Sequence, residues 1–434
     1  MSDLQIVQIN VSQTVGAIPS TLQKTGALVS TGSTPLEPGS SQVLTQLSDL
    51  EALVNVPITA LAVASGKLTV TLAAPLPSSY ELDSTVEMVI AGALPGGYNG
   101  SYTMIVKSAT SLEVTFSQTL PPANTMGTLQ LPHAAELLAM GTTFFAQGGN
   151  QSVYVLELGT AADVPTSIAA LSAYIDEPAL RFYTYLVPQE WDANADFIAL
   201  AKNHTDNTAM VYFFITTAVG PVNVYDGIKS VVAMVQDPAA PVTECSVASF
   251  MWNVLSASPS EINKVPPMAF RFLFGVTEFT GTGPAKVGLT NNKINYVGTG
   301  AEGGISNTIA MKGVASDGND FTYWYSVDWV QINTHQALAN AVINGSNNPI
   351  NPLYYNQDGI SRLQMVAQGV FDTGVTYGLV NGQTPVSAIP FKTYVKDNPN
   401  DYTIGRYAGL SATYTPMRGF TKIIFNINVT MQLS

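Results

Sequence analysis

Apolar and polar residues alternate at both ends of the chain. From Ile423 to Leu433 an apolar residue occupies every second position, with mostly polar residues between them. This period of two is typical of a strand that buries one face. A shorter run of the same kind covers residues 4–11. The pattern predicts strand-like arms at residues 1–20 and 419–434.

A long alternating strand at a free terminus is an aggregation hazard in a monomer, so we expect the arms to pair with another subunit. The apolar positions expected to make this inter-subunit strand exchange are Leu4, Ile6, Ile9, Val11, Ile423, Phe425, Ile427, Val429 and Met431. Residues 16–41, after the N-terminal run, are rich in Gly, Ser, Thr and Pro.

Residues 57–131 contain short alternating runs separated by Gly- and Pro-rich turns. Strands that recur about every 8–12 residues with such turns are typical of a small β-sandwich. The segment is therefore predicted to be an inserted all-β, sandwich-like module. A ligand-binding loop at the glycine cluster of residues 94–102 is a second, less favoured interpretation.

Residues 132–280 alternate between apolar runs and helical periodicity. Helices are expected at residues 134–149, 164–176, 192–204, 222–236 and 247–257, and strands at residues 152–159, 179–188, 209–217 and 266–276. Alternating strands and helices imply a mixed, largely parallel sheet with helices on both faces. Together with residues 21–56, this region is predicted to form an α/β core.

Residues 281–418 are predicted to form a separate C-terminal α+β domain. A hairpin is expected with its turn at residues 317–319. Helices are expected at residues 327–345 and 359–374, the second ending at Gly374 as its C-cap.

Composition narrows the function classes. Only 11% of the 434 residues are charged, against roughly 25% in a typical globular chain. A surface with so few charges is typical of a protein that buries much of its surface against other copies of the same chain, or of an extracellular polar β protein. The net charge of −13 is uneven, since residues 1–280 carry −14 and residues 281–434 carry +1. This balance argues against nucleic acid as the partner.

The start of the sequence lacks the basic and apolar regions of a signal peptide, and no apolar run is long enough to span a membrane. We therefore expect a protein that is made and kept in the cytosol without membrane insertion. The single cysteine, Cys245, excludes an intrachain disulfide, and its apolar neighbours predict a buried, inert thiol.

Candidate chemistry is sparse. His133, His204 and His335 lie far apart, and none has an acidic residue or cysteine at metal-ligand spacing. The glycines of "GTGAEG", residues 298–303, match a dinucleotide-binding pattern, but the following residues indicate a strand where that motif requires a helix. No enzyme activity, metal or cofactor is expected.

Two residue groups permit a second interpretation. Trp324, Tyr325 and Trp329 are predicted to be core or subunit-contact residues rather than a sugar-binding platform. The loose acidic group of Asp317, Asp320 and Asp328 is better explained by a turn. A lectin or carbohydrate-active enzyme stays as a rival class.

Several stretches resemble the sheath proteins of contractile bacteriophage tails. They are "AAELLAMGTTFFAQGGNQSVYVLEL", "GVASDGNDFTYWYSVDWVQINTHQALANAVI", "PLYYNQDGI" and the closing "GRYAGLSATYTPMRGFTKIIFNINVTMQLS". The resemblance covers most of residues 1–50 and 132–434. Residues 57–131 depart from it, because insertions at this place vary within the family.

The resemblance implies a structural protein of the virion, assembled in the host cytoplasm. Its copies would stack as rings, with six in a ring, around a tail tube protein, and would meet baseplate and tail terminator proteins. Contraction would drive the tube through the bacterial envelope, while neighbours stay linked through exchanged terminal strands. Residues 16–41 would be a flexible linker for that motion.

The resemblance also implies that residues 281–434 form the inner domain, which faces the tube. The candidate tube or subunit interface cations are Lys392, Lys396, Arg406, Arg418 and Lys422. The main alternative is a static virion component, such as a baseplate or decoration protein, that uses the β module for host or scaffold contact.

Overall fold

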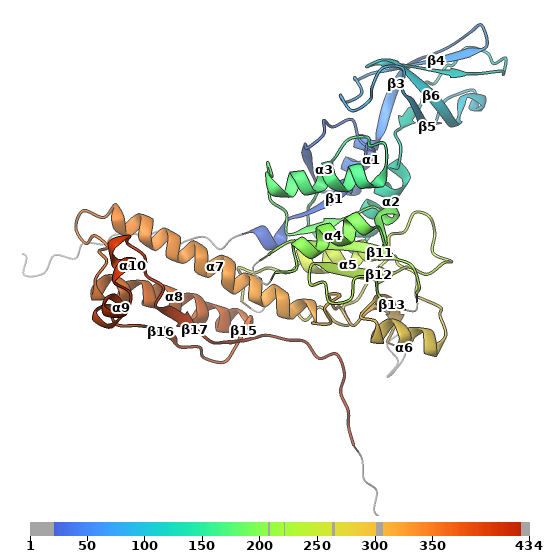
Figure 1. The fold of residues 1–434 in the computed structure, drawn as a ribbon. Helices are drawn as coiled ribbons and strands as arrows, with labels where there is room; N and C mark the ends of the chain where they lie inside the picture. The colour runs from blue at the N-terminus through green and yellow to red at the C-terminus, as the bar shows by residue number, and fades with distance from the viewer. Residues whose placement is uncertain (1–20, 207–208, 221, 263–264, 301–306, 427–434) are drawn as a thin grey trace, which may run out of the picture. The chain divides into compact units, whose positions relative to one another are not determined.

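The computed structural model describes residues 21–206, 209–220, 222–262, 265–300 and 307–426 (Figure 1). The chain divides into two compact units. Unit 1 holds Pro259–Ile262 and Trp329–Pro416, and unit 2 holds the remaining described residues. Seven of the residues predicted to make inter-subunit strand exchange lie outside the described residues: Leu4, Ile6, Ile9, Val11, Ile427, Val429 and Met431.

Unit 2 is built on an eight-stranded sheet with the order β14-β13-β12-β11-β10-β1-β9-β2. The strands are β1 (Gly26–Ser30), β2 (Ser41–Leu44), β9 (Val153–Glu157), β10 (Thr184–Leu186), β11 (Tyr212–Thr217), β12 (Val231–Val235), β13 (Asn295–Thr299) and β14 (Thr308–Met311). Neighbours from β9 to β13 run parallel, and β2 and β14 are antiparallel at the two edges. The largely parallel sheet predicted from the sequence is confirmed.

Helices cover both faces of this sheet. They are α1 (Leu47–Val54), α2 (Ala134–Ala146), α3 (Val164–Asp176), α4 (Ala195–Asn203), α5 (Ser246–Leu255) and α6 (Gly283–Asn291), with 3₁₀ turns η1 (Leu22–Lys24) and η3 (Gln189–Trp191). Successive residues of β11 show the two layers. Phe213 contacts Phe197 of α4 at a ring distance of 5.6 Å, and Phe214 contacts Phe250 of α5 at 5.9 Å. Because adjacent strand residues point to opposite faces, α4 and α5 lie on opposite sides.

Three segments of unit 2 differ from the prediction. Residues 222–236 contain strand β12 in place of a helix, because all five strand residues are buried and a doubly covered strand shows no alternation. The linker predicted at residues 16–41 is wrong over its described part, because residues 21–41 hold the buried strand β1 and end where the edge strand β2 begins. Residues 266–276 form an irregular segment with one bridge, Phe272 to Ile309, in place of a regular strand.

The inserted module is a closed barrel. Its strands are β3 (Asn55–Ala64), β4 (Lys67–Leu72), β5 (Thr85–Ala91), β6 (Gly100–Ser108), β7 (Ser111–Thr115) and β8 (Thr128–Gln130), with a 3₁₀ turn η2 (Gly96–Tyr98). All neighbours pair antiparallel in the order β3-β4-β7-β6-β5-β8, and β8 also pairs with β3. The predicted sandwich is therefore wrong. Alternation gives the buried face of each strand but does not show that β8 joins both edges.

Helix α7 (Phe321–Ser346) begins in unit 2 and continues into unit 1, because the units divide between Asp328 and Trp329. The predicted helix at residues 327–345 is confirmed but starts earlier. The turn at residues 317–319 leads directly into α7, while the hairpin itself joins β13 to β14. Because these two strands extend the unit 2 sheet, residues 281–328 join that unit, whereas the predicted C-terminal domain began at residue 281.

Unit 1 also contains α8 (Gln357–Tyr377), α9 (Phe391–Asp397) and α10 (Pro399–Thr403). Two small antiparallel sheets pair β15 (Val380–Asn381) with β18 (Thr415–Pro416) and β16 (Val386–Ala388) with β17 (Leu410–Ala412). Helix α8 ends at Gly378, which has a left-handed φ of 77°. The predicted C-cap, Gly374, lies inside the helix and is buried. No helix in the described residues is long and apolar enough to cross a membrane.

Candidate functional site

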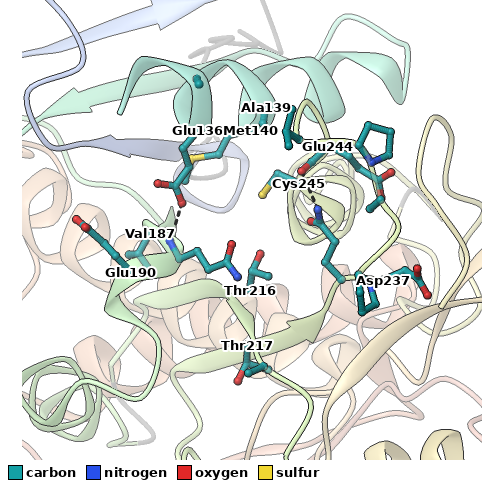
Figure 2. Close-up of a pocket in the computed structure, with 18 of the residues that line it drawn as sticks. Glu136, Ala139, Met140, Val187, Glu190, Thr216, Thr217, Asp237, Glu244 and Cys245 are labelled. Atoms are coloured by element: carbon teal, nitrogen blue, oxygen red, sulfur yellow. Dashed lines mark hydrogen bonds between the residues drawn. The ribbon is translucent and has the colours of Figure 1, made fainter. Parts of the chain in front are cut away.

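A cleft in unit 2 opens at the carboxyl ends of β10, β11 and β12 (Figure 2). This edge is where open α/β sheets place their ligands. The cleft has a volume of about 940 Å³ and is bordered by α2 and by the segment before α5. It is therefore the first place to look for chemistry.

Four carboxylates line this cleft: Glu136, Glu190, Asp237 and Glu244. Burial raises the pKa of Glu136, and the nearby Glu190 raises it further, while the backbone N–H of Gln189 donates to Glu136 Oε1 over 2.7 Å. Glu190 is exposed at the rim. None of the described ion pairs involves any of the four.

The other two carboxylates serve the fold. Asp237 Oδ2 accepts hydrogen bonds from the backbone N–H and the hydroxyl of Thr280, at 2.6 and 2.8 Å. Glu244 accepts from the backbone N–H and hydroxyl of Thr277, at 2.9 and 2.6 Å. The hydrogen bond from the Thr280 backbone N–H is the largest cause of the lowered Asp237 pKa. These pairs fasten residues 277–280 to the sheet.

Cys245 faces the cleft but is buried. Burial raises the pKa of its thiol to about 12, so the thiolate that a nucleophile requires is not formed near neutral pH. The prediction that this thiol is buried is confirmed. Among the described residues, no group of three or more His, Cys, Asp or Glu side chains is placed to hold a metal ion.

The aromatic residues of α7 are core residues. Trp329 is 1% exposed and donates from Nε1 to the carbonyl of Pro259 over 2.6 Å. Trp324 is 6% exposed and donates from Nε1 to Asp317 over 2.8 Å. Buried indoles offer no sugar-binding face, which argues against the lectin interpretation. Gly298 lies in β13, and the next element among the described residues is the predicted strand, β14, which pairs antiparallel with β13.

The predicted arm residues that the structure describes are exposed. Ile423 is 78% and Phe425 is 83% exposed, and residues 419–426 form no strand with any described residue. The start of this segment is held on unit 2, where the Lys312 ammonium donates to the carbonyl of Thr421 over 3.0 Å. The alternating apolar side chains of this segment therefore have no strand partner among the described residues.

The five predicted cations do not form one cluster within a unit. Lys392, Lys396 and Arg406 are exposed on unit 1, and Arg406 lies 3.9 Å from Asp401. Arg418 and Lys422 belong to unit 2.

Arg418 lies on the surface of α7 and the turn before it. Its guanidinium donates to Asn319 Oδ1 over 2.9 Å and lies 4.3 Å from the ring centroid of Tyr323. Arg418 thus helps to anchor the C-terminal segment on its own subunit, a role that its sequence context did not indicate.

Sequence reasoning missed a buried charge network at the start of α7. Asp328 is fully buried, and Oδ2 accepts hydrogen bonds from the hydroxyls of Tyr183 and Tyr212 at 2.9 and 2.8 Å. Its Oδ1 lies 3.8 Å from the Lys229 ammonium, which donates to the Ala209 carbonyl over 2.7 Å. Burial raises the pKa of Asp328 to about 6 and lowers that of Lys229.

A second missed group is Glu157, fully buried at the end of β9. It accepts hydrogen bonds from the hydroxyls of Ser30 and Thr34 and from the backbone N–H groups of Gly32, Thr34 and Gly159. These partners lie far away in the sequence, except for Gly159. The carboxylate fixes the loop between β1 and β2, and the Tyr80 hydroxyl of the barrel module donates to that loop at the Gly32 carbonyl over 2.5 Å.

Comparison with known proteins bears on the whole chain. No family model and no curated protein matches the sequence. Two cryo-electron microscopy structures of the anti-feeding prophage baseplate contain chains with a similar fold. In the sixfold-symmetrised structure, the aligned chain is 14% identical, with 99% of this chain and 100% of that chain covered and a TM-score of 0.57. In the contracted state the values are 10% identity, 100% and 99% coverage and a TM-score of 0.51.

A crystal structure of a sheath tail protein from Desulfitobacterium hafniense is 10% identical over 95% of this chain and 100% of that chain. Its TM-score of 0.44 is too low to establish a shared fold. The two baseplate matches extend over nearly the whole of both chains. They show that this chain shares its fold with chains of the anti-feeding prophage baseplate structures.

Proposed function

We propose that this chain is a structural subunit of a contractile tail sheath. The observation that carries the proposal is the fold shared with a baseplate chain of the anti-feeding prophage over 99% of this chain and 100% of that one. Copies would stack as rings, six to a ring, around a tail tube in the virion. Contraction would drive the tube through the host envelope, a mechanical role that requires no catalytic group.

Exchange of terminal strands would link neighbouring subunits. The exposed Ile423 and Phe425 support this part of the proposal, since their face has nothing to pack against among the described residues. An added strand gains backbone hydrogen bonds from an open sheet edge and register from its alternate side chains. The terminal segments would thus be connectors between copies.

Strand β17 offers a suitable edge in unit 1. Its only paired neighbour among the described residues is β16. The outer edge of β16 is occupied, because Gln368 Oε1 accepts from the Val386 N–H over 2.9 Å and Gln364 Nε2 donates to the Val386 carbonyl over 2.7 Å. An arm from another subunit would therefore add beside β17.

Contraction would repack whole domains as rigid bodies. We place unit 1 toward the tube, following the sheath resemblance. Its residues 329–416 carry four Lys and Arg against four Asp and Glu, so an acidic tube surface would not repel it. The barrel module would be the solvent-facing insertion.

Negative-stain electron microscopy of the purified full chain tests the proposal. A sheath subunit should form long tubes with regular striations. A static baseplate or decoration protein is the second candidate, and it is favoured by the fact that both matched chains come from baseplate structures. That candidate predicts discrete rings or single particles, and observing only these would overturn the sheath assignment.

A further inference from the structure

Unit 1 carries a cluster of aromatic rings around α9 and α10. Four rings contact one another, with centroid distances between 5.3 and 6.1 Å: Tyr355, Phe391, Tyr402 and Tyr407. Close to them in the sequence, Ile389, Ile404 and Tyr354 are 44%, 70% and 66% exposed. We call these seven residues the aromatic knob.

Hydrogen bonds orient two of the rings of the aromatic knob. The Tyr355 hydroxyl donates to the carbonyl of Arg406 over 2.7 Å, and the Tyr407 hydroxyl donates to the carbonyl of Ile389 over 2.6 Å. Tyr402 is 48% exposed although it contacts two other rings. Rigid, half-exposed tyrosines are enriched at protein interfaces, since they bury a large area at a small cost in side-chain entropy.

Two lysines stand beside the aromatic knob on α9. Lys392 and Lys396 are four residues apart on one face of the helix, and both are exposed. Neither makes an ion pair with a residue in the described part of the chain. The surface thus combines apolar area with two positive charges that form no ion pair among the described residues, and it fits a protein partner that is acidic.

The same chain offers such a partner surface on unit 2. Residues 21–258, the longest stretch of unit 2, carry 6 Lys and Arg against 19 Asp and Glu, a net charge of −13. The cleft at the carboxyl edge of the sheet holds Glu136 and the exposed Glu190, and no Lys or Arg is among its described lining residues. Val219 and Val242 on its border are 53% and 93% exposed, which supplies apolar area for contact.

We propose that the aromatic knob docks on unit 2 of a second copy of this chain, with Lys392 and Lys396 facing the carboxylates of that cleft. The two surfaces are different patches, so the contact is head-to-tail and leads to rings or helical filaments and not to closed dimers. The inference rests on the proposed function and deepens it, because it names a subunit contact separate from the terminal strands.

Charge reversal of the knob lysines tests the contact. The full chain with Lys392→Glu and Lys396→Glu is compared with wild type by sedimentation velocity over a concentration series, with negative-stain images of the same samples. The matched control reverses Lys24 and Lys202 on unit 2, which changes the net charge by the same amount. Circular dichroism checks that each variant is folded.

We expect the knob variant to need at least about a tenfold higher concentration to assemble, whereas the control assembles like wild type. Adding Glu190→Lys to the knob variant should recover part of the loss, because it restores opposite charges across the contact. A separate Ile404→Ser variant should weaken assembly through the lost apolar area without a change in charge.

Equal assembly of wild type and the knob variant would overturn the docking surface while leaving the sheath proposal intact. Loss of assembly that Glu190→Lys does not recover would overturn the cleft as the place where the knob docks. A wild-type chain that stays monomeric at every concentration would overturn the sheath proposal and this contact together.

Discussion

Glu157 is the residue on which the β1–β2 loop depends. Its Oε1 accepts from the backbone N–H groups of Gly32 and Gly159, both at 2.7 Å, and Oε2 accepts from Ser30 and Thr34. Glu157→Gln would point an amide NH₂ at groups that are themselves donors. We expect it to lower the free energy of unfolding by at least about 3 kcal/mol, as measured by urea denaturation.

Glu51 is exposed, and Glu51→Gln is the matched control for this substitution. It should change the free energy of unfolding by no more than about 0.5 kcal/mol. If Glu157→Gln also stays within about 1 kcal/mol of wild type, the loop does not depend on the buried carboxylate.

Asp328 makes stability depend on pH in an unusual direction. Burial raises its pKa in the folded chain to about 6, although Lys229 and the hydroxyls of Tyr183 and Tyr212 oppose the rise. Because the folded pKa exceeds that of the unfolded chain, this carboxyl stabilises fully below about pH 4, and its contribution is lost as the pH rises through about 6. The free energy of unfolding falls by about 3 kcal/mol over this pH range through this one carboxyl.

Asp328→Asn keeps an oxygen acceptor for the two tyrosines and removes the titration. The free energy of unfolding of this variant, minus that of wild type, should rise by about 3 kcal/mol from pH 4 to pH 7, as measured by urea denaturation. The exposed Asp372→Asn should show no comparable gain, since its carboxylate remains solvated. A difference between Asp328→Asn and wild type that is flat with pH would contradict the buried titration.

Residues such as these could not be found from the sequence. Glu157 bonds to the β1–β2 loop more than 120 positions away, and Asp328 receives its tyrosine partners from the residue before β10 and from β11. By contrast, the inertness of Cys245 follows from its apolar neighbours. Local context predicts whether a side chain is buried, but tertiary pairing decides what it bonds to.

At the scale of elements, two glycines of α8 distinguish the effect of side-chain packing on stability from the effect of helix propensity. A Cβ at Gly374 would lie 2.8 Å from Val380 Cγ2 and 3.1 Å from Trp329 Cζ3, whereas a Cβ at Gly369 would meet nothing within 4 Å. Gly374→Ala should therefore destabilise by about 1–3 kcal/mol through overpacking. Gly369→Ala should stabilise by up to about 1 kcal/mol, because alanine favours the helix.

Thermal unfolding of the two variants beside wild type measures both effects within one helix. Opposite shifts of the melting temperature are expected. An unchanged or higher melting temperature for Gly374→Ala would show that Gly374 is not tightly packed.

Elements with a clear period were predicted best. Helices α2, α3, α4 and α5 and strands β9, β10 and β11 lie where the pattern placed them. Strand β12 was missed because its five buried residues carry no alternation. The closed barrel was missed because closure depends on β8 pairing with both β3 and β5, and no single segment encodes this.

At the scale of the whole molecule, the sparse charge and the exposed arm fit one explanation. A chain with 11% charged residues and a net charge of −13 is poorly protected against self-association. Its exposed apolar residues include Phe420, Ile423, Ile424 and Phe425, all in the segment that leads to the C-terminus. Assembly would cover this segment, which a soluble monomer would leave in water.

The final prediction therefore concerns assembly rather than folding. Ile423 and Phe425 share one face of an extended segment, and Ile424 points to the other. Ile423→Asn with Phe425→Asn should abolish tube formation, as should deletion of residues 423–434. The melting temperature should not change, because both side chains are exposed in the single chain.

Ile424→Asn is the matched control, since it adds the same polarity on the face that an added strand turns away from the acceptor subunit. Electron microscopy should show tubes for this variant and none for the other two. The arm would form backbone hydrogen bonds with the acceptor sheet only when its apolar face is also buried there. Polar residues on that face should therefore be enough to prevent strand exchange. Normal tubes from the deletion variant would mean that the C-terminal arm is not what links the subunits.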